Sequence, residues 1–421
     1  MICSVLGLGY IGLPIASIIA SKGIKTFGID VNKNLVKDIN NCKIHFYEKD
    51  LDQLLKKVIK NNYLTAKNLP DKSDVFIITV PTPIFKKSKK PNLNFVFDAI
   101  KSIANILEKN NLIIIESTIP VGTTEKIYLF LKNLRKDLNF PSIDYQSDKN
   151  KNDVFISHCP ERVLPGNIIY ELYQNDRIIG GLTKKCSLMA SKFYKNFIKG
   201  KTIITNAKTA ELCKLSENSF RDVNIAFANE LSMICDENKV DVWELIKIAN
   251  LHPRVNILQP GPGVGGHCIA VDPWFLTYSN PKTAKIIKQA RLVNLEKETY
   301  IYSKIKKIIK GHSKSVSEMV ISCFGITFKA NVSDLRESPS LSIIKKLLKL
   351  PFKKINIVEP NINKIPQFID NDNVELCSIS KSIEQSDILL FFVEHHEFKN
   401  INREKLKGKV VLDIKGILNK N

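Results

Sequence analysis

A glycine-rich turn close to the first residue restricts the fold of this chain more than any other feature. Residues 2–6 form a short apolar run, and residues 7–12 read Gly-Leu-Gly-Tyr-Ile-Gly before a second apolar stretch of helical character. In a strand–turn–helix unit, Gly7 permits the tight turn, Gly9 lets the backbone approach a pyrophosphate, and Gly12 lets helix and strand pack closely. The pattern therefore predicts an α/β domain that binds a dinucleotide.

Three further side chains are candidates for this dinucleotide site because each follows a predicted strand. Asp30 ends the second strand, eighteen residues beyond Gly12. A carboxylate at this position accepts hydrogen bonds from both ribose hydroxyls and repels a 2′-phosphate, which favours NAD over NADP. Thr82 and Thr118 follow two more strands of the same sheet and are candidate cofactor contacts, with turn or helix-cap roles as the alternative.

The order of apolar runs predicts two α/β domains around a helical middle. Strand-like runs alternate with helical stretches up to about residue 200, which is typical of a Rossmann-type parallel sheet covered on both faces. Residues 209–250 carry apolar side chains at helical intervals, so we expect a long helix that links two domains. The C-terminal part repeats the first pattern as a smaller Rossmann-like α/β domain, and the second strand ends in an acid in both, Asp30 and Glu359. The expected strands are residues 2–6, 26–30, 74–80, 112–116, 154–156, 320–325, 355–359, 388–393 and 410–414. The expected domains are residues 1–200, 201–312 and 313–421.

Composition narrows the classes of function. The nine cysteines form no Cys-x-x-Cys pair, so neither a metal-ligand set nor a disulfide framework is expected, and a reducing, cytoplasmic compartment fits best. The net charge of +21 comes from short scattered lysine groups, which favours solvated surfaces over a nucleic-acid partner. The uncharged residues 1–21 also fit a signal peptide or membrane helix, but their glycines and the lack of a basic start favour the strand–turn–helix unit, without membrane insertion.

Residues 261–268, Gly-Pro-Gly-Val-Gly-Gly-His-Cys, form the second informative motif. Glycines at this density let the main chain approach a substrate and present a single thiol at the edge of the loop. Cys268 is therefore a candidate nucleophile, with a buried structural thiol as the alternative. Asp272 follows four residues later and is a candidate for orienting a water or a lysine.

Two other polar groups are candidates for substrate contacts. Lys214, Asn218 and Arg221 are spaced to share one face of the predicted long helix. The alternative is a solvated face, but the neighbouring residues are apolar, and a buried lysine and amide need partners such as a substrate. Residues 159–166, Cys-Pro-Glu-Arg-Val-Leu-Pro-Gly, place an acid and a base at a strand end, where an ion pair or a turn is the alternative.

The segment after the first C-terminal strand carries two more basic candidates. Lys329 and Arg336 are placed to bind phosphates, with a surface salt-bridge network as the alternative. Ser338 and Pro339 have the character of a helix start.

In combination, these motifs resemble the UDP-glucose/GDP-mannose dehydrogenase family over essentially the whole chain. They occur in family order as GLGYIGLP, VPTP, ESTIPVGT, CPERVLPG, ELCKLSENSFRDVNIAFANE, GPGVGGHCIAVDPWFL and FKANVSDLRESP. The segment HPRVNILQPGPGVGGHCIAVDPWF is most similar to the branch that oxidises UDP-N-acetyl-D-mannosamine for surface polysaccharides such as enterobacterial common antigen. Glucose-specific members tend to carry GFGGSC and NPEFLREG instead, so Val264, His267 and the CPERVLPG segment count against glucose. UDP-N-acetylglucosamine, which differs at C2, is the alternative substrate, and a non-enzymatic nucleotide- or nucleic-acid-binding protein is a remote one.

The resemblance implies a role for each candidate residue. Cys268 would be the nucleophile, Lys214 the proton donor and acceptor, and Glu161 or Asp272 the acid that activates the hydrolytic water. The implied NAD contacts are Gly7, Gly9, Tyr10, Ile11, Gly12, Asp30, Thr82, Thr118 and Arg336. The implied nucleotide-sugar contacts are Arg162, Val163, Lys214, Asn218, Arg221, His252, Arg254, Gly265 and Lys329. A homodimer built on the middle domain is also implied, because an arginine like Arg254 reaches in from a neighbouring subunit in the family.

The implied reaction is the four-electron oxidation of a sugar CH2OH to a carboxylate. The first hydride passes to NAD as Lys214, or a water that it orders, takes the hydroxyl proton. The Cys268 thiolate then adds to the aldehyde to give a thiohemiacetal, whose oxygen accepts hydrogen bonds from Lys214 and Asn218. Loss of a second hydride leaves a thioester, which water hydrolyses.

Overall fold

The computed structural model of the chain describes residues 1–46, 48–146, 153–164 and 166–418, and it divides into two compact units. The first unit comprises Met1–Glu217 and Trp274–Ser279, and the second comprises Asn218–Pro273 and Asn280–Asn421. Helix α8 (Ala207–Asn238) contributes residues to both units. Pro165, within the predicted motif 159–166, lies outside the described residues.

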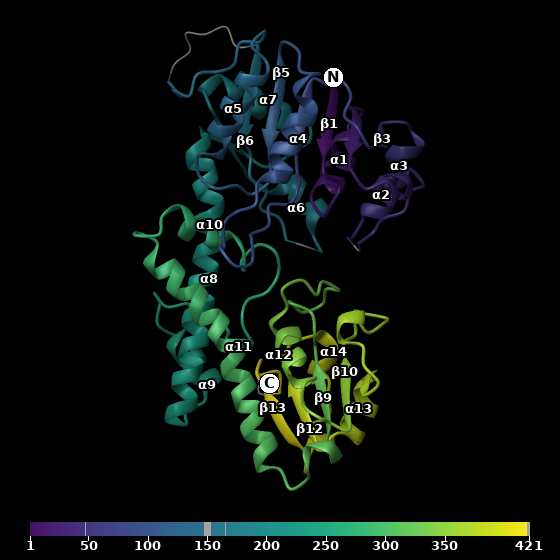
Figure 1. Ribbon diagram of the computed structural model, residues 1–421, viewed down its shortest axis with the longest axis vertical. Coiled ribbons are helices and arrows are strands. Elements are labelled where there is room, and N and C mark those ends of the chain that lie inside the picture. Colours follow the sequence, from purple (N-terminus) through teal and green to yellow (C-terminus); the bar gives the residue numbers. More distant parts are fainter. Residues whose placement is uncertain (47, 147–152, 165, 419–421) are drawn as a thin grey trace. The chain divides into compact units, whose positions relative to one another are not determined.

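The first unit is built on an eight-stranded sheet (Figure 1). Its strands are β1 (Ile2–Leu6), β2 (Lys25–Ile29), β3 (Leu64–Lys67), β4 (Val75–Ile78), β5 (Asn111–Ile115), β6 (Val154–His158), β7 (Arg177–Gly181) and β8 (Thr202–Asn206). Their order is β3-β2-β1-β4-β5-β6-β7-β8, and all neighbours pair in parallel except β6 and β7, which are antiparallel. Every residue of β4 and β5 is buried, as expected for continuous apolar strands covered on both faces.

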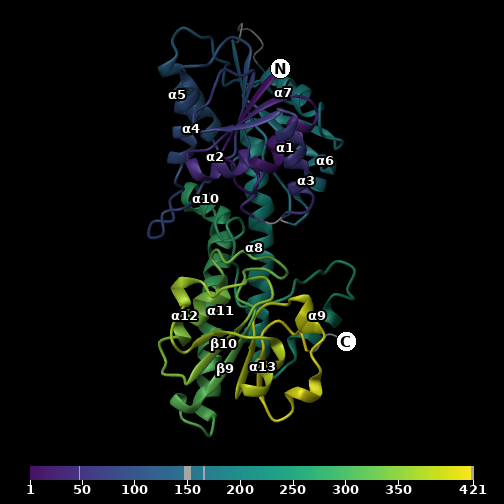
Figure 2. The same ribbon diagram turned by 90° about the vertical axis from the view of Figure 1, so that its right-hand side faces the viewer.

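Helices cover both faces of this sheet. They are α1 (Gly12–Ser21), α2 (Lys33–Asn40), α3 (Leu51–Lys60), α4 (Asn94–Ala104), α5 (Thr123–Leu134), α6 (Ile168–Gln174) and α7 (Lys184–Tyr194). Apolar residues of α1, α2, α3, α6 and α7 form one buried cluster with the sheet, and those of α4 and α5 form another. Figure 2 shows α4 and α5 on one side and α1, α6 and α7 on the other.

The second unit combines helices with a smaller parallel sheet. Its helices are the C-terminal part of α8, α9 (Val242–Ala249), α11 (Lys285–Gly311), α12 (Pro339–Leu347), α13 (Ile379–Gln385) and α14 (His396–Lys399), and α10 (Asp272–Ser279) begins in it. Its strands are β9 (Val320–Phe324), β10 (Lys354–Val358), β11 (Val374–Leu376), β12 (Ile388–Phe391) and β13 (Val410–Asp413), in the order β11-β10-β9-β12-β13. Ile301, Ile305 and Ile309 of α11 belong to the core of this sheet.

The predicted fold class is confirmed, with two local departures. The helical stretch 209–250 is two helices rather than one, because the chain turns after α8 and Asp241 Oδ1 accepts hydrogen bonds from two amides at the start of α9. Four strands were not predicted: the edge strands β3 and β11, the antiparallel strand β7 and the partly exposed edge strand β8. Among the residues that the structure describes, no helix combines the length and hydrophobicity that crossing a bilayer requires. The boundaries at residues 200 and 312 stay predictions.

Candidate functional site

The turn after β1 has the geometry of an anion cradle. Gly7 has a φ of +95°, and a Cβ on Gly12 would lie 1.7 Å from the Gly7 carbonyl oxygen, so side chains at these positions would strain the turn. A Cβ on Gly9 would meet nothing within 4 Å, which leaves the backbone there accessible to a ligand. Helix α1 follows Ile11 without a side-chain cap among the described residues, so its first amides are available to a phosphate. Tyr10 and Ile11 are half-buried in this turn.

The carboxyl edge of the same sheet carries the other predicted cofactor contacts of the first unit. Asp30 directly follows β2, and its Oδ2 accepts a hydrogen bond from the Leu8 amide at 3.0 Å, which fixes the carboxylate beside the glycine turn. Thr82 and Thr118 follow β4 and β5 at this edge, and both are half-buried. The glycine cradle, the uncapped helix and the carboxylate together fit the pyrophosphate and the ribose of NAD.

In the second unit, the thiol loop (residues 261–268) packs against the segment that follows β9. The Gly266 amide donates a hydrogen bond to the Arg336 carbonyl oxygen at 3.0 Å. A Cβ on Gly265 would lie 2.9 Å from the Cβ of Phe328, and a Cβ on Gly266 would lie 2.9 Å from the Phe328 ring. Gly265 and Gly266 are therefore required by the close packing of the loop on the C-terminal domain.

The first residue of the thiol loop is anchored to α8 and α11 by a buried polar network. The Gly261 amide donates to Asn229 Oδ1 at 2.8 Å, and Asn229 Nδ2 donates to Asn294 Oδ1 at 2.9 Å. Asn294 Nδ2 in turn donates to Asp222 Oδ1 at 2.8 Å. Arg291 Nη1 donates to the same oxygen at 2.7 Å. The loop that carries the thiol is thus tied to a buried ion pair between two helices.

Cys268 differs from most of the other thiols in exposure. It is half-buried, and its carbonyl oxygen accepts a hydrogen bond from the Asp272 amide at 2.8 Å, so the thiol directly precedes α10. The buried thiols are Cys3, Cys159, Cys186, Cys235, Cys323 and Cys377. Burial raises the pKa of the Cys3, Cys159 and Cys323 thiols, as expected for structural cysteines.

Two of the predicted catalytic residues are hydrogen-bonded to each other. Asn218 Nδ2 donates a hydrogen bond to Asp272 Oδ2 at 2.6 Å, and both side chains are buried. Lys214 lies one turn before Asn218 in α8 and is half-buried, whereas Arg221 is exposed. The amide and the acid are therefore held at one place, and their catalytic roles stay predictions.

The predicted residues His252 and Arg254 lie in the segment after α9. Both side chains are exposed, and the Arg254 amide donates a hydrogen bond to His252 Nδ1 at 3.3 Å. Exposed positions of this kind suit contacts with a ligand or with another chain.

The described part of the 159–166 motif is fixed by its own acid and base. Glu161 is buried, and its Oε2 accepts a hydrogen bond from the Val163 amide at 2.8 Å. Arg162 Nη1 donates to Glu217 Oε1 at 3.0 Å, and Arg162 Nη2 donates to the Asp176 carbonyl oxygen at 2.5 Å. The ion-pair interpretation of Arg162 is thus seen in the structure, and its contact with a substrate stays a prediction.

Sequence reasoning missed a buried cluster beside this motif. Arg177 Nη1 lies 3.3 Å from Glu116 Oε1, and the Tyr194 hydroxyl donates to the same oxygen. Burial raises the pKa of Glu116 to about 7, although Arg177 and Tyr194 act in the opposite direction, and Glu161 adds repulsion. The sequence signal for this cluster was Glu116, an acid at the end of the apolar run Leu-Ile-Ile-Ile-Glu.

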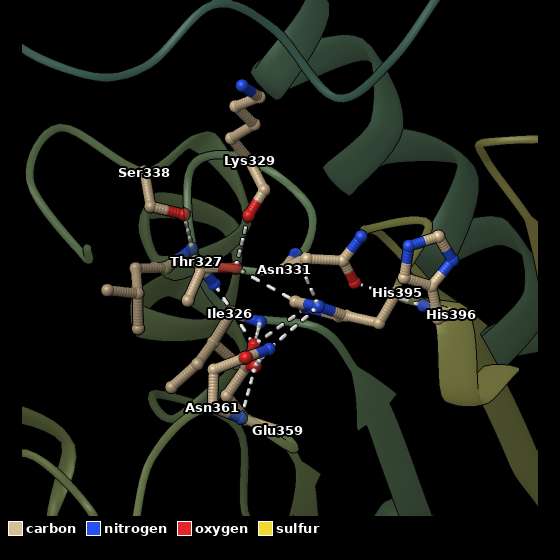
Figure 3. Close-up of polar contacts among 10 residues, drawn as sticks. Ile326, Thr327, Lys329, Asn331, Ser338, Glu359, Asn361, His395 and His396 are labelled. Carbon is tan, nitrogen blue, oxygen red and sulfur yellow. Dashed lines mark hydrogen bonds and ion pairs between the residues drawn. The ribbon is translucent and has the colours of Figure 1, made fainter. Parts of the chain in front are cut away.

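The two basic candidates of the C-terminal domain have different surroundings. Arg336 is exposed, and its guanidinium donates to Asp334 Oδ1 at 3.0 Å and to Oδ2 at 2.6 Å, as the salt-bridge alternative predicted. Lys329 lies in the loop after β9, and its side chain extends away from the polar cluster beneath it (Figure 3). The predicted helix start is confirmed, because Ser338 Oγ accepts a hydrogen bond from the Leu341 amide of α12.

A glycine cradle followed by a carboxylate at the end of the second strand is a feature of NAD-dependent dehydrogenases, and a half-buried thiol on a glycine loop suits a nucleophile. Comparison with known families agrees: residues 1–198 match the NAD binding domain of the UDP-glucose/GDP-mannose dehydrogenase family, residues 208–296 its central domain, and residues 322–420 its UDP binding domain. The chain belongs to this family, and NAD is its cofactor.

Individual relatives resemble the chain over nearly its full length. A UDP-N-acetyl-D-mannosamine dehydrogenase of Campylobacter jejuni is 52% identical over 96% of this chain and 97% of its own. An NDP-N-acetyl-D-galactosaminuronic acid dehydrogenase of Ralstonia solanacearum is 47% identical over 98% of this chain and 95% of its own. The solved structure of a UDP-D-ManNAc dehydrogenase from Pyrococcus horikoshii superposes with a TM-score of 0.87 at 36% identity, covering 99% of this chain and 96% of that one.

Proposed function

We propose that this chain oxidises UDP-N-acetyl-D-mannosamine at C6 to UDP-N-acetyl-D-mannosaminuronate. The observation that carries the proposal is the 52% identity with a full-length UDP-N-acetyl-D-mannosamine dehydrogenase. The thiol-loop segment, residues 252–275, supports the same branch of the family. The product would supply surface polysaccharides of the enterobacterial common antigen type.

The first half of the proposed reaction is an alcohol oxidation. The glycine cradle, Asp30, Thr82, Thr118 and Arg336 hold NAD, which accepts the hydride that leaves C6 in each oxidation when it is bound. Lys214, or a water that it orders, takes the proton from the C6 hydroxyl as the first hydride leaves. The product of this half is an aldehyde.

The second half depends on the thiol. The Cys268 sulfur forms a bond to the aldehyde carbon, and the thiohemiacetal oxygen accepts hydrogen bonds from Lys214 and Asn218. The 2.6 Å hydrogen bond to Asp272 orients the Asn218 amide, so its donor is fixed before the substrate arrives. Departure of the second hydride leaves a thioester on Cys268.

Hydrolysis completes the proposed cycle. Water adds to the thioester carbon as Glu161 or Asp272 takes its proton, and the thiolate of Cys268 leaves. Both acids are buried. Arg162, Val163, Arg221, His252, Arg254, Gly265 and Lys329 are proposed to hold the nucleotide sugar.

We further propose that the chain acts as a homodimer in the cytoplasm. Phe220, Phe227 and Ile234 follow one another at seven-residue intervals on α8 and are 70%, 57% and 48% exposed. This spacing puts them on one stripe of the helix, which a second copy would cover. Light scattering should give the mass of a dimer for the wild type and a lower mass for Phe227→Lys, whereas a monomeric wild type would contradict the proposal. The cytoplasmic location is supported by the nine cysteines, which form no Cys-x-x-Cys pair.

The substrate proposal is tested by comparing three nucleotide sugars. UDP-N-acetylmannosamine, UDP-N-acetylglucosamine and UDP-N-acetylgalactosamine are each incubated with NAD, and NADH and the uronate are measured. The third sugar is included because of the Ralstonia relative. We expect kcat/KM for the manno sugar to be at least about tenfold higher than for the other two, since misplaced hydroxyls leave polar groups of the site unpaired. A preference for either other sugar would overturn the proposal.

A further inference from the structure

The C-terminal sheet repeats the strand–turn geometry of the cofactor site residue by residue. Gly7 and Gly325 each follow the first strand with a positive φ, +95° and +86°. The Gly7 amide donates to the last carbonyl of β2 at 2.7 Å, and the Gly325 amide donates to the last carbonyl of β10 at 2.9 Å. The next amide donates to an acid in both sheets: Leu8 to Asp30 at 3.0 Å, and Ile326 to Glu359 at 2.8 Å.

The strand registers extend this correspondence to a second position. Leu6 pairs with Ile78 at the end of β4, and Phe324 pairs with Phe391 at the end of β12. Four residues beyond these partners lie Thr82 in the first sheet and His395 in the second. His395 is therefore the topological counterpart of a predicted NAD contact, and Glu359 is the counterpart of Asp30.

The counterpart residues in the C-terminal sheet bind each other. His395 Nε2 lies 3.1 Å from Glu359 Oε2, and both side chains are fully buried (Figure 3). Asp30 and Thr82 are only half-buried. At the position in the second sheet that corresponds to Asp30 and Thr82, the two side chains thus contact each other.

The hydrogen bonds of His395 fix its tautomer. The Asn331 amide donates to Nδ1 at 3.1 Å, so Nδ1 carries no proton and Nε2–H donates to the Glu359 carboxylate. Burial raises the pKa of Glu359, but the hydrogen bond from His395 and the other contacts outweigh it and lower the pKa overall. The Glu359 carboxylate therefore accepts from Nε2, and Nδ1 accepts from the backbone of the loop after β9.

This pair holds both ends of the loop formed by residues 326–331. At its start, the Ile326 and Thr327 amides donate to Glu359 Oε2 at 2.8 and 3.3 Å. At its end, Asn331 donates to His395, as described above. Between them, the Thr327 hydroxyl donates to the Lys329 carbonyl oxygen at 2.8 Å, as Figure 3 shows. These hydrogen bonds fix the backbone of Lys329, whose side chain extends away from the polar cluster (Figure 3).

We propose that His395 and Glu359 are positioning residues for nucleotide-sugar binding: they fix loop 326–331 and thereby place Lys329 against the phosphates. The proposal rests on the proposed function of Lys329. Phe328 of the same loop also packs on Gly265 and Gly266. The acid that binds cofactor in the first sheet thus has a counterpart that organises substrate binding in the second.

The test uses three substitutions of His395 in the full chain and one matched control. His395→Ala removes every hydrogen bond of the imidazole, including the contacts with the Thr327 hydroxyl and the Asn361 amide at 3.3 and 3.0 Å. His395→Asn keeps an acceptor near the Nδ1 position for the Asn331 amide, and His395→Gln keeps a donor near the Nε2 position for Glu359. The control is His396→Ala at the adjacent exposed histidine, because its contact with Asn331 is made by the backbone amide and survives the substitution.

We expect His395→Ala to raise the Kd of UDP, measured by calorimetry, and the KM of the nucleotide sugar about tenfold, with kcat within about twofold. The KM of NAD should be unchanged. His395→Asn should recover most of the lost affinity and His395→Gln less of it, and His396→Ala should match the wild type. Asp30→Ala should show the opposite pattern, with weakened NAD and unchanged UDP.

Several results would overturn the proposal. An unchanged Kd of UDP in His395→Ala would do so, and so would an equal loss of NAD and UDP affinity, which indicates general loosening. If His395→Ala does not fold, the other two variants provide the test. Wild-type UDP affinity in His395→Gln but not in His395→Asn would then contradict the proposal. A wild type that binds UDP but fails to oxidise the nucleotide sugar would instead reject the proposed function, and calorimetry would still test the pair.

Discussion

Asp222→Ala should destabilise the protein far more than Asp236→Ala, although both carboxylates pair α8 with α11. Asp222 lies 2.7 Å from Arg291, and the two side chains are at most 2% exposed. Asp236 lies at the same distance, 2.7 Å, from Lys304, but these side chains are 36% and 35% exposed. The two ion pairs thus differ in burial and not in length.

The magnitude follows from what each substitution leaves behind. Asp222→Ala leaves the Arg291 guanidinium buried without its charged partner, which lowers the free energy of unfolding by about 3–5 kcal/mol. Asp236→Ala leaves the Lys304 side chain solvated, so the free energy of unfolding should fall by less than about 1 kcal/mol. In a unit of roughly 200 residues, where 1 kcal/mol shifts the Tm by about 2–4 °C, the buried substitution should lower the Tm by roughly 6–20 °C.

The assay is thermal unfolding by circular dichroism or calorimetry, with the double variant Asp222→Leu/Arg291→Met as a second control. Burial raises the pKa of Asp222 although its contacts with Arg291 and Asn294 lower it, so these contacts do not fully offset the cost of burying the carboxylate. Replacing both partners by apolar side chains should therefore recover at least half of the loss. Equal shifts for Asp222→Ala and Asp236→Ala would refute the reasoning.

Three further predictions concern the cofactor, the thiol and the buried acid. Asp30→Ala should raise the KM of NAD by about tenfold or more, through loss of a charge-assisted contact with the ribose, and an unchanged KM in steady-state kinetics would exclude that contact. Cys268→Ala should form no uronate by mass spectrometry, and wild-type uronate formation would reject covalent catalysis. The pKa of Glu116 is raised to about 7 from 4.5, so its stabilising contribution is full below about pH 4.5 and is lost as the pH rises through 7. The Tm of the wild type should fall between pH 5 and 8 more steeply than that of Glu116→Gln, and parallel profiles would show that Glu116 does not titrate there.

The parts of the fold that the sequence predicted are those with local signals. The turn at Gly7, the acid at Asp30 and the helix start at Ser338 each depend on a few neighbouring residues, and the structure has all three. The break after α8 was missed, because the cap by Asp241 is a short signal inside a long apolar pattern.

The parts that were not predicted depend on residues far apart in the chain. Asp222 and Arg291 are 69 residues apart, and His395 meets Glu359 across 36 residues. Each of these side chains alone is an ordinary polar residue within a helix or at a strand end. Only the packing of two elements shows that it is buried and what it binds.

The most direct test of the account is the mass of the protein during turnover. Glu161→Gln and Asp272→Asn are mixed with UDP-N-acetylmannosamine and NAD, quenched in acid and analysed by mass spectrometry, with Cys268→Ala as the control. The account predicts a sugar-nucleotide adduct on the peptide that contains Cys268 in at least one of the two acid variants, and none in the control. Covalent catalysis would be contradicted if the wild type produced uronate and NADH while both variants turned over and stayed unmodified at Cys268.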